Sequence, residues 1–182
     1  MLRLLSFVFL LAVGLVAGTA AQSKPLPVVP AVDLSRYAGK WYEIARLPNR
    51  FQKQCVGDVT AEYALLANNQ IRVINSCRLQ NGQIERAEGL ARLADKNGPN
   101  TKLQVRFAPA WLSWLSVVWG DYWIIALADD YSYAVVGTPD RKYLWVLART
   151  PKLDAAVYQK IVQQTAAQGF AVTQLVKTPQ TK

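Results

Sequence analysis

The feature that most constrains the fold is a series of short apolar stretches, each of about 6–10 residues, separated by turn residues. Turn signals such as Asn81-Gly82 and the segment 95–100 lie between them, and a helical period is absent until the last quarter of the chain. Eight strands are predicted, at residues 41–47, 57–66, 71–77, 83–93, 102–107, 121–127, 131–137 and 143–149. Because no helix separates these strands, a parallel α/β fold is disfavoured and antiparallel pairing is favoured.

The period changes only near the C-terminus. A helix is predicted from Leu153 or Asp154 to a C-cap at Gly169, followed by a short strand over 170–175. The predicted fold is therefore all-β: an eight-stranded antiparallel up-and-down β-barrel with a C-terminal α-helix packed outside, or alternatively a sandwich. Eight strands enclose a space just wide enough for one small ligand.

The N-terminal residues are predicted to direct export. Residues 1–21 combine Arg3, an apolar run and small residues near Ala21, which is typical of a signal peptide; an uncleaved anchor is the alternative. No cysteine lies near the cleavage site, so a lipid anchor on an N-terminal cysteine is not expected. We expect a Pro-rich leader at 22–32, a barrel domain at 33–178 and a tail at 179–182.

Composition excludes several classes of site. The chain has no histidine, so Ser-His-Asp or Cys-His catalysis and His-ligated metal sites are excluded, and we expect no metal or cofactor. The two cysteines, Cys55 and Cys77, suggest one disulfide in an exported protein, with a free reactive thiol as the alternative. The net charge of +9 shows no basic-aromatic cluster for nucleic acid. Attraction to an anionic membrane surface, or solubility alone, accounts for it.

Three motifs resemble those of the lipocalin family, and most closely those of bacterial lipocalins and their apolipoprotein D-like relatives. They are "GKWYEIAR" with Gly39 and Trp41, "ALADDYSYAVV" with Asp130 and Tyr131, and "LWVLARTP" with Arg149. Asp129 departs from the usual threonine of the second motif. In an up-and-down meander all three motifs fall at the same end of the barrel. The resemblance implies that this end is closed, with Trp41 as a plug and Arg149 packed across its ring.

The same topology places Cys55 and Cys77 at the open rim on neighbouring strands, where a disulfide is feasible. Strand alternation predicts the inward side chains. For the ligand-binding lining we expect Tyr63, Val73, Asn75, Phe107, Trp123, Tyr133 and Trp145. The last three strands are apolar on both faces, so the sequence does not decide which of their side chains point inward. The alternative is that these side chains simply fill the barrel.

The segment "APAWLSWLSVVWG" (108–120) is unusually apolar for a loop, with Trp111, Trp114 and Trp119. Tryptophan favours membrane interfaces, and apolar loops seldom face water without a reason. This loop is predicted either to contact a membrane or a partner, or to cover the mouth as a lid or pack on the barrel.

The leading functional hypothesis is a non-enzymatic binding protein that stores or transports a small hydrophobic ligand. The resemblance implies a fatty acid or lysophospholipid, carried in the periplasm, at the outer-membrane periphery or outside the cell. Arg78, Arg106 and Arg141 are candidates for holding the ligand's head group. The alternatives are an envelope interaction protein with a filled barrel and a Trp-rich docking loop, or an enzyme that uses Glu43, Glu88 or a cysteine. Sequence leaves open the ligand, the oligomeric state and the direction in which Glu43 points; if Glu43 points inward, it needs a polar partner.

Overall fold

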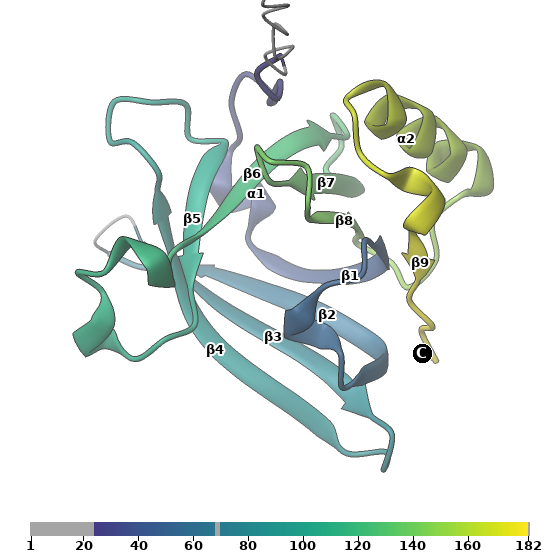
Figure 1. The fold of residues 1–182 in the computed structure, drawn as a ribbon, viewed down its shortest axis with the longest axis horizontal. Coiled ribbons are helices and arrows are strands. Elements are labelled where there is room, and N and C mark those ends of the chain that lie inside the picture. Colours follow the sequence, from purple (N-terminus) through teal and green to yellow (C-terminus); the bar gives the residue numbers. More distant parts are fainter. Residues whose placement is uncertain (1–23, 68–69, 182) are drawn as a thin grey trace, which may run out of the picture.

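A closed antiparallel β-barrel forms the body of the protein (Figure 1). The computed structural model describes residues 24–67 and 70–181, so the predicted signal peptide lies outside the described residues. Each strand pairs with its neighbours in sequence, and β1 pairs with both β8 and β2, which closes the ring. The strands are β1 Gly39–Arg46, β2 Cys55–Leu65, β3 Ile71–Leu79, β4 Ile84–Leu93, β5 Lys102–Arg106, β6 Gly120–Leu127, β7 Tyr133–Gly137 and β8 Leu144–Ala148. The predicted eight-stranded up-and-down barrel is confirmed.

The C-terminal helix α2 (Ala155–Ala167) lies outside the ring, as predicted (Figure 1). Asp154 caps it by accepting hydrogen bonds from the first-turn amides, and Gly169 ends it with a positive φ. The helix buries Ile161 against an outer apolar cluster that also contains Val135, Val146 and Phe170. Both faces of β7 and β8 are therefore apolar, because one faces the barrel interior and the other faces α2.

Short helical turns connect the strands. A one-turn helix, α1 (Leu34–Tyr37), precedes β1 and was not predicted. The 3₁₀ turns are η1 Arg50–Gln52, η2 Ala110–Leu112, η3 Ser116–Val118 and η4 Val172–Gln174. No helix in the described part of the chain is long and apolar enough to cross a membrane.

The strand predicted over 170–175 is wrong. Phe170 is instead buried in the outer cluster, where its ring lies so close to Gly137 that a Cβ there would approach it to 2.7 Å. The chain then turns through η4, and the strand forms later, as β9 (Val176–Lys177), which pairs with Ala45 and Arg46 of β1. Because Phe170 is buried beneath α2, the residues that follow it turn through η4 and do not form the predicted strand.

The segment 176–181, which we call the C-terminal strap, lies between β1 and β2. Direct pairing of these two strands is limited to Gly39–Tyr42 of β1. Beyond it, the Thr178 amide donates to the Ile44 carbonyl of β1 at 2.9 Å, and the Asp58 amide of β2 donates to the Pro179 carbonyl at 2.8 Å. The strap thus supplies hydrogen-bond partners to two strand edges that would otherwise be left unpaired.

The described part of the leader, residues 24–32, also packs on the barrel. Leu26 is buried in the outer cluster and Val32 in the inner one. The Val29 amide donates to the Ile124 carbonyl of β6 at 3.0 Å. This stretch contains no helix or strand, and it is held in place by these contacts.

Candidate functional site

One end of the barrel is closed by Trp41, Arg149 and the turn before β1. The Trp41 side chain is fully buried, and its Nε1 donates to the Tyr37 carbonyl at 2.8 Å. The Arg149 guanidinium lies 3.8 Å from the centre of the indole ring and donates to the Lys40 carbonyl at 3.0 Å. A planar cation suits this position because it stacks on the ring and still has donors for backbone oxygens. Gly39 has a φ of +90°, and a Cβ there would lie 3.4 Å from Arg149.

The turn between β6 and β7 reaches the same end. Tyr131 has a φ of +63°, and its hydroxyl accepts a hydrogen bond from the Asp33 amide at 2.8 Å. Asp130 accepts from the Ser132 amide at 2.9 Å, which shapes the turn. A hydrogen bond from the Ser132 side chain, together with the one from the Ser132 amide, holds the pKa of Asp130 below its ordinary value. The three sequence motifs therefore meet at one end, and they position backbone and rings there.

Three buried tyrosines form the floor of the interior. The Tyr122 hydroxyl lies 2.7 Å from that of Tyr37 and 2.8 Å from that of Tyr63. Burial raises the pKa of Tyr63 to about 12 and raises the pKa values of Tyr37 and Tyr122 well above 10.0. Every phenol has a partner, so the hydroxyls can be buried without a lost hydrogen bond. Sequence reasoning missed Tyr37 and Tyr122.

Glu43 points inward, into a cluster of polar side chains beneath the rim. Glu43 is 2% exposed and faces the interior, paired across from Leu147. A β-bulge between Glu43 and Ala45 shifts the alternation by one residue, so Arg46 also faces inward. Arg46 donates to the Glu43 carboxylate at 2.7 Å. No pattern in the sequence reveals this bulge.

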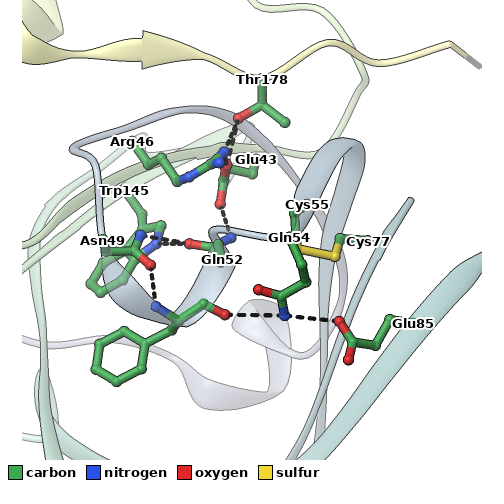
Figure 2. Close-up of a disulfide and its surroundings, with 11 residues drawn as sticks. Glu43, Arg46, Asn49, Gln52, Gln54, Cys55, Cys77, Glu85, Trp145 and Thr178 are labelled. Atoms are coloured by element: carbon green, nitrogen blue, oxygen red, sulfur yellow. Dashed lines mark hydrogen bonds and ion pairs between the residues drawn. A yellow bond between two sulfur atoms is a disulfide. The ribbon is translucent and has the colours of Figure 1, made fainter. Parts of the chain in front are cut away.

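Two further residues complete the coordination of Glu43 (Figure 2). Gln52 of η1 donates to the carboxylate at 2.7 Å, and the Thr178 hydroxyl of the C-terminal strap donates to its other oxygen. Gln52 in turn accepts from Nε1 of Trp145 at 3.0 Å. Trp145 therefore faces the interior as expected, with its indole nitrogen used within this cluster. The buried carboxylate is satisfied by three donors, which is what its burial requires.

The predicted disulfide between Cys55 and Cys77 is present at the rim, with a Cα–Cα distance of 5.6 Å (Figure 2). It joins the start of β2 to β3, near the C-terminal strap. Glu85 lies beside the two sulfur atoms and accepts a hydrogen bond from Gln54 at 2.8 Å. Because both sulfurs are in the disulfide, neither is a thiolate that could bind a metal or attack a substrate.

Above the buried inner cluster, side chains of the inner wall are partly or fully exposed. Strand register places Asn75, Ala87 and Gly89 on the inner face, since Val73 of the buried inner cluster pairs with Gly89. The Phe107 ring lies over Gly89, where a Cβ would approach it to 2.8 Å, yet this ring is 42% exposed. Tyr63 and Val73, also expected in the lining, are buried lower down in the inner cluster.

The inward orientation expected for Trp123 and Tyr133 is wrong. Both side chains pack against the outer cluster beneath α2. Trp123 pairs across from Gly137, which faces Phe170 on the outer side, and Lys102 lies over its ring at 4.3 Å. The sequence did not show which side chains of these strands point inward, because their outer face, packed against α2, is as apolar as their inner face.

The Trp-rich loop (108–119) lies beside β4 and β5, outside the ring of strands (Figure 1). Trp119 holds it to the outer wall: the Arg92 guanidinium lies 3.8 Å from its ring centre, and Nε1 donates to the Ser113 carbonyl at 2.8 Å. Trp111 and Trp114 are 74% and 78% exposed. The loop therefore packs on the barrel through one tryptophan and presents two to the surroundings; it does not cover the mouth.

Two of the three arginines expected at the rim have their donors engaged. Arg78 donates to the Asp58 carboxylate at 2.7 Å, and this hydrogen bond lowers the pKa of Asp58. Arg141 donates to the carbonyls of Pro139, Gln168 and Lys24. Both residues stabilise the rim and its connections. The carboxylates considered for catalysis are likewise paired, Glu43 in its cluster and Glu88 with Arg72 on the outer surface.

A barrel plugged at one end and open at the other is a scaffold of small-molecule-binding proteins. Comparison with known proteins defines the family. The lipocalin-like domain model matches residues 32–180. Temperature-induced lipocalin-1 of Arabidopsis thaliana is 38% identical over 160 residues, covering 87% of this chain and 85% of the relative. Outer membrane lipoprotein Blc of Escherichia coli K12 is 35% identical over 162 residues, covering 86% of each.

The solved structure of insecticyanin from Manduca sexta superposes with a TM-score of 0.65 at 25% identity, covering 88% of this chain and 86% of that one. The chain belongs to the lipocalin family, whose members bind small hydrophobic ligands. The expected resemblance to bacterial lipocalins and to apolipoprotein D is confirmed.

Proposed function

We propose that this protein binds a single-chain lipid, a fatty acid or lysophospholipid, and stores or carries it in the cell envelope after export. The observation that carries the proposal is the contrast inside the barrel. The floor is filled by Trp41 and the three tyrosines, whereas Phe107 faces inward higher up and is 42% exposed. An inward aromatic ring that stays exposed gains about 25 cal/mol per Å² when an acyl chain covers it.

The envelope location is supported by three features of the chain. The first 21 residues have the pattern of an export signal, the disulfide suits an oxidising compartment, and a bacterial relative is named an outer membrane lipoprotein. A binding role also fits the carboxylates, since Glu43 and Glu88 are both engaged by arginines.

The test is to purify the exported protein with its disulfide intact, extract and identify any copurified lipid by mass spectrometry, and titrate the delipidated protein with cis-parinaric acid. Phe107→Asp is expected to weaken binding by about tenfold or more, because the charge would face the acyl chain. Ile84→Asp is the matched control: Ile84 is 52% exposed, but it lies on the outer face of β4. Absence of lipid together with no uptake by the wild type would refute the proposal and favour the alternative, an interaction protein.

We further propose that the Trp-rich loop docks this protein on a membrane surface. Residues 107–119 carry no charge, and Trp111, Trp114 and Val117 are all strongly exposed. Arg92 and Arg106 lie at the base of the loop against Trp119, so an anionic surface would be attracted to the same side.

Flotation with vesicles of phosphatidylcholine and phosphatidylglycerol tests the docking. The double variant Trp111→Ser/Trp114→Ser should lose most of its vesicle binding. The control variant Leu65→Ser/Leu66→Ser removes exposed apolar side chains at the C-terminal end of β2, away from the Trp-rich loop. It should leave vesicle binding unchanged. If both variants float as the wild type does, the loop does not dock on membranes.

A further inference from the structure

The barrel wall is split between β4 and β5. Their pairing runs from Leu93–Leu103 to Leu90–Arg106 and ends there, so residues 84–89 of β4 have no strand partner on that side in the described structure. A hollow of about 370 Å³ lies at the split, lined by residues 88–90 of β4 and 106–110 of the chain leaving β5. The split lies in the open-end part of the wall, where β4 extends beyond the end of its pairing with β5.

Arg106 is the cation of this hollow, and it is incompletely satisfied. Its side chain is only 5% exposed and donates to the Ala108 carbonyl, and its guanidinium lies 5.3 Å from the centre of the Trp119 ring. Its Nε is buried and has no hydrogen-bond partner among the described residues. A buried charged donor without an acceptor is costly, and an anion bound in the hollow would remove that cost.

The acid that shares the hollow is already paired. Glu88 accepts two hydrogen bonds from Arg72, at 2.7 and 2.9 Å. Its charge is therefore offset, and Arg106 leaves the hollow positive. The other lining residues carry no charge: Gly89, Leu90, Phe107, Ala108, Pro109 and Ala110. This combination of one buried cation and an apolar wall matches an amphiphile with an anionic head.

Register shows that the hollow reaches both faces of the wall. Arg106 and Leu90 alternate with the inward Val105 and Ala91, so they face outward, whereas Gly89 and Phe107 face inward. A Cβ at Gly89 would lie 2.6 Å from the Arg106 carbonyl, so only glycine permits the chain to cross β4 so closely. A ligand head at Arg106 is thereby placed next to the exposed inner ring of Phe107.

We infer that the hollow between β4 and the Trp-rich loop binds the carboxylate or phosphate head of a single-chain amphiphile, whose chain passes Phe107 into the barrel. This inference rests on the proposed lipid-binding function and adds the position and charge of its head-group site. Of the three rim arginines, the structure assigns this role to Arg106, because Arg78 and Arg141 are engaged with other partners. It also places lipid entry at the β4–β5 edge of the open end, next to the exposed tryptophans.

Isothermal titration of the disulfide-intact protein tests the site with three probes: oleate, 1-monoolein with the same chain and an uncharged head, and acetate with the head alone. Arg106→Gln should weaken oleate binding by about tenfold and change monoolein binding by less than about twofold. Arg92→Gln is the matched control, since Arg92 also contacts Trp119 but does not line the hollow. Added salt should weaken oleate binding and leave monoolein binding unchanged.

A second variant, Ala110→Trp, fills the hollow without changing charge, and it keeps the inference testable if Arg106→Gln does not fold. It should weaken both oleate and monoolein. The inference is overturned if Arg106→Gln loses both lipids equally or neither, if Ala110→Trp binds both as the wild type does, or if acetate binds as tightly as oleate. If the wild type binds monoolein and oleate but Arg106 has no effect, the lipid-binding function stands and only the head-group site is refuted; if it binds neither, both proposals are refuted.

Discussion

The two ends of the barrel use similar side chains for opposite purposes. At the closed end Trp41 is fully buried, its nitrogen is hydrogen-bonded and Arg149 covers its ring. At the open side Trp119 is also covered by an arginine, but Trp111 and Trp114 beside it face outward, and one nitrogen of Arg106 has no partner in the part of the chain that the structure describes. The closed end is complete in itself, whereas the open side has exposed apolar rings and a cation with one nitrogen unpaired among the described residues.

This difference separates stability from binding. Groups whose contacts are complete in the folded chain stabilise the fold, and groups with unsatisfied contacts are available to a ligand. Substitutions at the closed end should therefore lower the free energy of unfolding, and substitutions at the open side should change affinity with little effect on the fold.

The largest expected effect is at Trp41. Trp41→Ala should lower the free energy of unfolding by about 3–5 kcal/mol, because it opens a cavity under Arg149 and removes the ring contact. Phe107→Ala should cost less than about 1.5 kcal/mol, since the ring is already 42% exposed. Urea denaturation of both variants measures the difference. Similar losses at the two positions would contradict the division between the ends.

The next largest effect is expected at Glu43, which lies near the open end but is buried like the closed-end residues. Glu43→Gln should lower the free energy of unfolding by about 2–3 kcal/mol, because Arg46 would be left buried without its counter-charge. Glu88→Gln removes a carboxylate from an exposed ion pair and serves as the control, with no measurable change expected. Thermal melts at neutral pH distinguish the two; an unchanged melting temperature for Glu43→Gln would show that the cluster does not stabilise the barrel.

The smallest effect at neutral pH, and one that emerges only in alkali, concerns the tyrosine floor. Burial raises the pKa of Tyr63 to about 12 and raises those of Tyr37 and Tyr122 as well, so the folded state holds these protons after an unfolded chain would release them. The contribution of these tyrosines to the free energy of unfolding is thus fully present below pH 10, and it is lost as the pH rises from 10 toward 12 and above. Phenolate absorbance at 295 nm should show the exposed tyrosines titrating first and these three only with unfolding. Titration of all tyrosines together near pH 10 would contradict this.

The strands and their order could be predicted because β2, β3 and β5 largely alternate apolar with polar or charged side chains, and turn residues mark their ends. The inward placement of Tyr63 and Val73 follows from that alternation. Alternation failed for Trp123 and Tyr133, whose outer face is buried by α2. It also gave no sign of the bulge in β1 that turns Glu43 and Arg46 to one side. Both failures arise from contacts with segments distant in sequence, which local patterns do not encode.

The C-terminal strap has a consequence for the order of events during synthesis. Its Thr178 hydroxyl donates to Glu43, a residue 135 positions earlier, and its backbone bridges the edges of β1 and β2. A ribosome makes β1 and β2 long before it makes residues 176–181, so the upper edges of both strands stay unpaired throughout most of translation. A chain that folds only after its synthesis is complete avoids that exposure, because the strap is then present to pair with both strand edges.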